Sequence, residues 1–125
     1  TNPMIFLELG SSIKNWTDKK TGKIIGEALI ECINNFKSAK KIAIALGGPH
    51  YSQKFTKILI ESEYAIGTIV PKYALPYINE DIYKSIIKQT IEKIEYVIID
   101  WKGLGKEKQR IMEIVNKHNL NIIKI

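Results

Sequence analysis

The sequence has 125 residues and a formal net charge of +6, carried by 18 lysines and one arginine against 13 acidic residues. Hydrophobic residues make up 45% of it, which excludes disordered and fibrous classes and suffices for a single packed domain over residues 1–125. No apolar run reaches the ~18 residues that a membrane-spanning helix needs, and the lone Cys32 excludes an internal disulfide and fits a reducing cytoplasm.

Strands and helices alternate along the first half of the chain. Residues 4–9 (MIFLEL) read as a buried strand, and the polar residues 14–23 (KNWTDKKTGK) as a loop. A helix is expected over residues 23–36, because its apolar residues recur at helical spacing. Cys32 falls on the apolar face of this helix, so we expect its thiol to be buried. A second strand follows at residues 41–46 (KIAIAL).

The second half continues the alternation. Pro71 ends a strand because proline cannot donate to a central ladder, and Asn79 is a favourable N-cap with two acidic residues after it. In chain order we expect a helix over 54–62, a strand over 64–70, a helix from Asn79 to about 93, a strand over 95–101, a helix ending near 118 and a strand over 121–125. The helix after Asn79 is expected to turn four residues inward, Ile82, Ile86, Ile91 and Ile94.

This alternation predicts an α/β fold in which helices pack on a mostly parallel or mixed sheet. The strands are almost continuously apolar, which is typical of a parallel sheet covered on both faces. In such folds ligands bind beyond the carboxyl ends of the strands. The segments expected at that edge are Glu8 to Ser12, Gly47 to Tyr51, Pro71 to Tyr73 and Asp100 to Lys102.

Five side chains at this edge are candidates for chemistry. His50 can act as a general base or a metal ligand near neutral pH, or it can simply cap its turn through a hydrogen bond. Lys54 and Lys72 can hold a phosphate or stabilise an oxyanion, or they can be solvated surface groups. Tyr51 and Tyr73 can stack a terminal base, donate a phenolic hydrogen bond or only pack.

Backbone and charge complete the candidate site. Gly47 and Gly48 allow a sharp turn that brings backbone N–H groups close to a ligand. Glu8, inside an apolar strand, needs a buried partner such as a site lysine unless it faces solvent. The net positive charge favours a polyanion such as tRNA, and a lysine-rich solvated surface explains it equally well.

Four segments together resemble the archaeal and plant type of D-aminoacyl-tRNA deacylase, in order and in spacing. They are FLELGSS (6–12), GGPHYSQKFT (47–56), VPKYAL (70–75) and DWKGLGKEKQR (100–110). Members of that family are about twice as long, so we expect this chain to be the C-terminal part of a longer protein. The resemblance implies a three-layer α/β sandwich similar to the phosphorylase and peptidyl-tRNA hydrolase type.

The resemblance also implies an activity, the hydrolysis of the ester that joins a D-amino acid to the terminal ribose of tRNA. His50 and Tyr51 match within one family motif, Lys72 and Tyr73 within another, and Glu8, Gly10 and Ser11 within a third. The family is zinc-dependent, so His50 is the expected metal ligand. The remaining zinc ligands are expected outside this chain, because the family's histidine-rich segments lie upstream of it.

The expected mechanism is attack of a water on the aminoacyl carbonyl, activated by His50 or by a zinc ion that it helps to hold. The N–H groups of the Gly47-Gly48 turn, with Lys72 or Lys54, are expected to stabilise the oxyanion. Glu8 is the third candidate catalytic residue, and Ser11 is a candidate substrate contact. Two other functions stay open: another hydrolase or a nucleoside phosphorylase on the same fold, and a basic RNA-binding module without catalysis.

Overall fold

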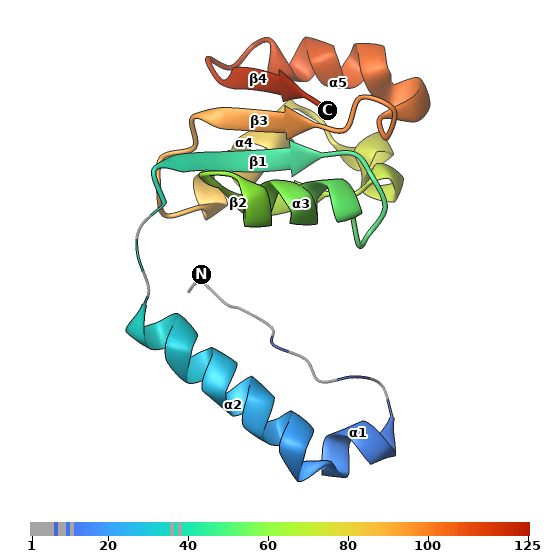
Figure 1. Ribbon diagram of the computed structural model, residues 1–125. Coiled ribbons are helices and arrows are strands. Elements are labelled where there is room, and N and C mark those ends of the chain that lie inside the picture. The colour runs from blue at the N-terminus through green and yellow to red at the C-terminus, as the bar shows by residue number, and fades with distance from the viewer. Residues whose placement is uncertain (1–6, 8–9, 11, 36, 38) are drawn as a thin grey trace. The chain divides into compact units, whose positions relative to one another are not determined.

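The structure, a computed structural model, describes residues 7, 10, 12–35, 37 and 39–125 (Figure 1). Two compact units are present, residues 1–38 and residues 39–125, and each is described by itself. Most of the strand expected over residues 4–9 lies outside the described residues, as do Glu8 and Ser11, whose expected roles stay predictions. Leu7, which is described, belongs to no helix or strand.

The described part of the first unit contains two helices, α1 (Ile13–Thr17) and α2 (Lys19–Asn34). The loop expected over residues 14–23 is therefore wrong, because two polar side chains cap helices there. The Ser12 hydroxyl accepts from the N–H of Asn15 at 3.3 Å, and the Asp18 carboxylate accepts from the N–H groups of Lys20 and Thr21 at 3.2 and 3.1 Å. Such caps satisfy backbone donors that the first turn of a helix leaves unpaired.

The apolar face of α2 is not covered by the described part of its own unit. None of its described residues is buried, and Leu29 and Ile33 are 49% and 67% exposed. The expectation of a buried Cys32 thiol is therefore wrong, since Cys32 is exposed. The short α1 offers too little apolar surface to cover a helix three times its length.

The second unit is built on a four-stranded sheet in the order β2-β1-β3-β4, with all neighbouring strands parallel. The strands are β1 (Lys41–Leu46), β2 (Tyr64–Val70), β3 (Tyr96–Ile99) and β4 (Asn121–Lys124). The connecting helices are α3 (Gln53–Glu61), α4 (Glu80–Gln89) and α5 (Lys108–Val115), with short 3-10 helices η1 (Lys72–Tyr77) and η2 (Gly105–Glu107). The expected α/β fold with a parallel sheet is confirmed.

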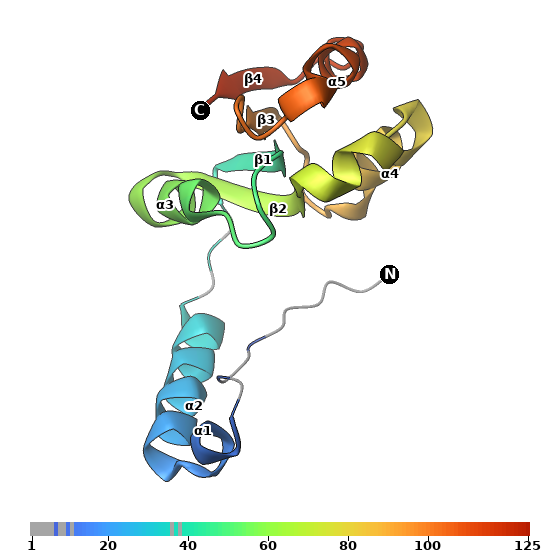
Figure 2. The same ribbon diagram turned by 90° about the vertical axis from the view of Figure 1, so that its right-hand side faces the viewer.

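Helices cover both faces of this sheet. Figure 2 shows α3 on one side of the strands and α4 and α5 on the other. Alternate residues of β1 point to opposite faces, so Ala43 and Ala45 pack with Phe55 of α3, while Ile44 packs with Tyr83 of α4 and Ile111 of α5. This double burial explains why the strands are apolar without alternation.

The expected course of α4 is partly wrong. The helix ends at Gln89 instead of near residue 93, and Ile91 is 76% exposed. Tyr83 and Ile86 are its buried residues, whereas Ile82 is 41% exposed. Among the described residues, no helix combines the length and apolar character needed to cross a bilayer.

Candidate active site

The loops that leave β1 and β2 are joined by their backbones at the carboxyl edge of the sheet. The N–H of Gly47 donates to the carbonyl of Val70, and the N–H of Lys72 donates to the carbonyl of Gly48, both at 2.8 Å. Gly47 and Gly48 have φ angles of +95° and +74°, backbone conformations that residues other than glycine rarely adopt. The paired glycines therefore turn the chain sharply back toward the end of β2.

The loop that leaves β3 meets the same turn. A Cβ atom added to Gly103 would overlap the backbone nitrogen of Gly48, and one added to Gly47 would lie 3.0 Å from the carbonyl oxygen of Asp100. The two loops can approach this closely only because glycine occupies both sides of the contact. Three successive strand ends of the sheet are thus in direct contact.

Asp100 lies at the centre of these contacts and is only 5% exposed. Its Oδ1 accepts from the ammonium of Lys54 at 2.6 Å and from the N–H of Gly103 at 3.1 Å. Burial raises the pKa of the Asp100 carboxyl, but these hydrogen bonds outweigh it, so that the pKa lies below its usual value. Asp100 is therefore an ionised, paired carboxylate at neutral pH.

From the sequence, Asp100 is expected at this edge, but no role was predicted for it. The available signal was an acidic residue directly after a run of buried apolar residues, where a charge needs a partner. Its partner Lys54 could not be identified from the sequence, because it lies 46 positions away among 18 lysines.

His50 lies on the surface of the same edge in a small aromatic cluster. Its Nδ1 is 3.3 Å from the phenol oxygen of Tyr73, and its ring stacks on that of Tyr73 with a centroid distance of 6.3 Å. The ring of Tyr51 meets His50 edge-on at 4.7 Å. Tyr51 and Tyr73 are 86% and 65% exposed, so both keep free ring surface beside the imidazole. The structure thus brings these three predicted site residues together.

Tyr73 and Lys72 are positioned by η1, which is anchored to α5. Arg110 donates to the carbonyl of Leu75 at 2.5 Å and pairs with Glu107 at 2.7 Å. The Lys72 side chain extends to the β3 loop, where its Cε lies 3.2 Å from the position that a Cβ of Gly105 would take. Within the described residues, the Lys72 ammonium has no acidic partner.

Some of the groups expected to stabilise an oxyanion are engaged in other contacts. The N–H of Gly47 is occupied by Val70, and the nitrogen of Gly48 packs against Gly103. The glycine pair therefore shapes the turn and does not offer two free N–H groups, contrary to expectation. Lys54 is held by Asp100, which leaves Lys72 as the predicted cation that no acidic side chain among the described residues neutralises.

The described residues do not form a metal site. They include no group of three or more His, Cys, Asp or Glu side chains that could hold an ion, and the ring contacts of His50 are two tyrosines. The second histidine, His118, is engaged elsewhere, with its Nε2 2.8 Å from Oε1 of Glu80 in the first turn of α4. His50 alone therefore does not fit a zinc ion, and zinc binding stays a prediction.

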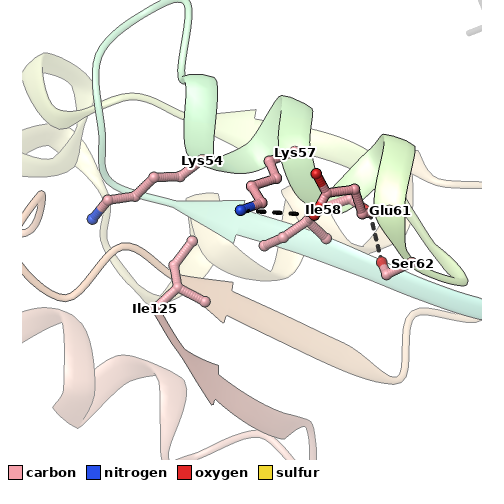
Figure 3. A pocket seen from close by; sticks show the side chains of 6 residues that line it. All are labelled: Lys54, Lys57, Ile58, Glu61, Ser62 and Ile125. Carbon is pink, nitrogen blue, oxygen red and sulfur yellow. Dashed lines mark hydrogen bonds and ion pairs between the residues drawn. The ribbon is translucent and has the colours of Figure 1, made fainter.

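A shallow groove of about 420 Å³ adjoins the site along α3 (Figure 3). Lys54 lines it together with Lys57, Ile58, Glu61, Ser62 and Ile125. Lys57 and Glu61 pair across one turn of the helix at 3.8 Å, so the exposed charges of its wall largely cancel. The groove is mostly apolar, and Lys54 connects it to the site through its ion pair with Asp100.

An all-parallel sheet whose strand-end loops gather a histidine, a lysine and two tyrosines at one edge defines an α/β protein of the kind that binds ligands at that edge. A family model described as D-aminoacyl-tRNA deacylase matches residues 1–123. The chain therefore belongs to the D-aminoacyl-tRNA deacylase family, which confirms the resemblance seen in its motifs.

Individual relatives agree with this assignment. The chain is 36% identical over 124 residues to the D-aminoacyl-tRNA deacylase of Pyrococcus abyssi and 39% identical over 123 residues to that of Methanocaldococcus jannaschii. These matches cover 98% and 94% of this chain but 45% and 47% of the relatives, so the chain spans a little under half of their length.

A solved crystal structure shares the fold. It belongs to a conserved protein of unknown function and matches with a TM-score of 0.80 at 23% identity, over 92% of this chain and 40% of the other. At this level of identity the match supports the architecture alone.

Proposed function

We propose that the protein hydrolyses the ester bond of D-aminoacyl-tRNA and that the carboxyl edge of its sheet carries the reaction. The observation that supports this most directly is the contact of His50 with Tyr73, the residue that follows Lys72 in the chain, beside the glycine turn. Family membership supplies the substrate class, since the relatives are named for this activity. The tRNA acceptor end is the proposed partner, and the cytoplasm, where aminoacyl-tRNA is used, is the proposed location.

His50 is the proposed general base. In the tautomer whose Nδ1–H donates to the phenol oxygen of Tyr73, the lone pair on Nε2 is free to take a proton from water. The oxygen of that water adds to the aminoacyl carbonyl, whose electron pair moves to the carbonyl oxygen. Collapse of this intermediate breaks the bond to the ribose oxygen, which takes the proton from the imidazolium. The products are a free D-amino acid and tRNA.

Lys72 is the proposed electrostatic partner of the developing oxyanion. Its ammonium is the predicted site cation that no described acidic side chain neutralises, and it extends from the same loop that carries Tyr73. A fixed positive charge near the oxyanion stabilises the transition state more than the neutral ester. Tyr51, with most of its ring exposed, is the proposed platform for the terminal adenine.

The decisive test is a deacylation assay on matched D- and L-aminoacyl-tRNA with the full natural chain. His50→Ala should lower turnover of the D-substrate by about 10²- to 10⁴-fold, the range for a general base, with an unchanged circular dichroism spectrum. His118→Gln is the matched control and should retain turnover, because His118 pairs with Glu80 instead.

Four other outcomes are informative. Loss of activity in a chelator, restored by zinc, would support the predicted metal with ligands outside the described residues. Full turnover by His50→Ala would refute the proposed base. Phosphate-dependent cleavage of nucleosides, or tRNA binding without any ester cleavage, would instead favour a phosphorylase or a non-catalytic RNA-binding module.

A further inference from the structure

The lysines of the second unit differ in whether an acidic side chain neutralises them. Six form ion pairs, namely Lys41 with Glu63, Lys54 with Asp100, Lys57 with Glu61, Lys84 and Lys117 with Glu80, and Lys93 with Glu95. Five others at the carboxyl edge have no ion pair with any described residue, and we call them the lysine track: Lys72, Lys102, Lys106, Lys108 and Lys124. Only Lys40 and Lys88, also unpaired among the described residues, lie elsewhere.

Contacts of Lys72, Lys108 and Lys124 with the loop after β3 define the course of the track. Lys72 reaches Gly105, the residue before Lys106. Lys108, at the start of α5, places its ammonium 5.1 Å from the ring centroid of Trp101, and Lys124, the last residue of β4, lies 4.3 Å from the same centroid. The track therefore runs from the loop that carries Tyr73, across the end of β3, to the end of β4.

Trp101 fixes the far end of the track. Its ring is half-buried against the main core, and its N–H on the backbone donates to the carbonyl of Ile125 at 3.0 Å. An indole face attracts ammonium groups through its quadrupole without cancelling their charge. Lys108 and Lys124 are thereby held in place and still carry their full positive charge toward solvent.

The acidic residues of this edge cannot neutralise the track, because they are already engaged. Asp100 is buried and paired with Lys54, and Glu107 is paired with Arg110. Gathered like charges repel one another and destabilise the folded chain, a cost that a bound polyanion removes. The edge therefore gathers five lysines that no described acidic side chain neutralises, and it can receive a row of negative charges.

We propose that four lysines of the track, Lys102, Lys106, Lys108 and Lys124, bind the phosphodiester backbone of the tRNA acceptor stem, with Lys108 and Lys124 held for this contact by Trp101. Lys72, at the near end of the track, keeps its proposed place at the reacting ester. The choice of tRNA rests on the proposed function, whereas the track itself rests on the contacts above. Lysine ammonium groups act on phosphates as point charges and read no base sequence. The track accordingly sets where the stem lies, and the cluster around His50 receives its terminal nucleotide.

The test measures binding of uncharged tRNA to the full natural chain by fluorescence anisotropy from 50 to 200 mM salt. The variant Lys108→Gln with Lys124→Gln should reduce the slope of log affinity against log salt by about 2, because each duplex phosphate contact contributes about 0.9. Over this fourfold rise in salt, the wild type should lose about twelvefold more affinity than the variant.

The matched control removes the same charge at the opposite edge of the sheet. Lys41→Gln with Lys93→Gln changes two lysines that are paired with Glu63 and Glu95, and it should leave the salt slope unchanged. Trp101→Leu should weaken binding at constant slope, and Trp101→Phe should restore it, because the lysines remain but only an aromatic ring holds them.

Equal loss of slope in the two double variants would overturn the proposal, since it would show a response to net charge alone. An unchanged slope in the Lys108 and Lys124 variant would overturn the proposal too. So would a variant that loses its binding to anionic phosphatidylserine vesicles but keeps its full binding to tRNA. Because this tRNA carries no amino acid, it has no ester to hydrolyse, and the binding result is independent of the reaction. A protein that binds tRNA through the track but cleaves no ester would refute only the proposed function.

Discussion

Replacing Gly103 by alanine tests whether the contact between strand-end loops builds the site. The new Cβ would lie 2.7 Å from Oδ2 and 2.8 Å from Cγ of Asp100, and closer still to the backbone nitrogen of Gly48. The contact with the Gly48 nitrogen is the closest, and ordinary contacts begin near 3.4 Å, so the loops must separate by about 1 Å. Neither neighbour is the flexible end of a side chain, because one is backbone and the other a buried, paired carboxylate.

We expect two measurable consequences of Gly103→Ala. Overpacking of this kind costs about 1–3 kcal/mol of unfolding free energy, measured by urea denaturation. Displacement of the loops by up to about 1 Å should lower turnover of D-aminoacyl-tRNA by about 10²-fold.

Gly22→Ala is the control for Gly103→Ala. Gly22 lies in α2, where an added Cβ meets no described atom within 4 Å, so alanine should stabilise the helix by about 0.5–1 kcal/mol. A Gly103→Ala protein with an unchanged denaturation midpoint and normal turnover would refute the loop contact as the basis of the site.

Two further predictions concern stability. Asp100→Asn should lower the unfolding free energy at pH 7, because the folded protein lowers the pKa of the Asp100 carboxyl and so is stabilised at pH values above the pKa of the unfolded state, about 3.9. This stabilisation is lost as the pH falls through the folded-state pKa, so the difference in unfolding free energy between the variant and the wild type should shrink below about pH 3.9. A difference that does not change with pH in urea titrations would contradict this. Asn79→Ala should cost about 1 kcal/mol, because the Asn79 side chain accepts from the N–H of Ile82 at 2.9 Å and caps α4, and an unchanged thermal midpoint would contradict that role.

Strong periodicity and turn residues explain where the sequence predicted the fold well. The bounds of β1 and β2 coincide with the expected ones, since each is an apolar run ended by glycine or proline. The α1 helix and the first turn of α2 were missed because the polar composition hides their N-caps, Ser12 for α1 and Asp18 for α2. The end of α4 was placed too late because Ile91 and Ile94 continue its spacing, although Ile94 is buried only after the chain has left the helix.

The gathering of site residues followed from a general rule of parallel sheets, whereas their partners did not. The rule placed His50 and Tyr73 at one edge, and the structure shows them in contact. Nothing in the sequence indicates that Lys54 pairs with Asp100, since long-range partners depend on how helices dock on the sheet. The loss of Gly47 as a free donor has the same origin, because its acceptor, Val70, is supplied by the neighbouring strand.

The central place of β1 has a consequence for how the chain is made. The strand pairs with β2 on one side and with β3 (Tyr96–Ile99) on the other. More than half of the second unit must therefore be synthesised before the second edge of β1 can pair. Parallel neighbours cannot zip from a hairpin and must close over long loops, which is slow. In a chain whose synthesis stops before β3, one edge of β1 has no partner strand and its apolar backbone edge stays exposed. Another chain can pair with this edge, so we expect misfolding to begin there when β3 forms too slowly.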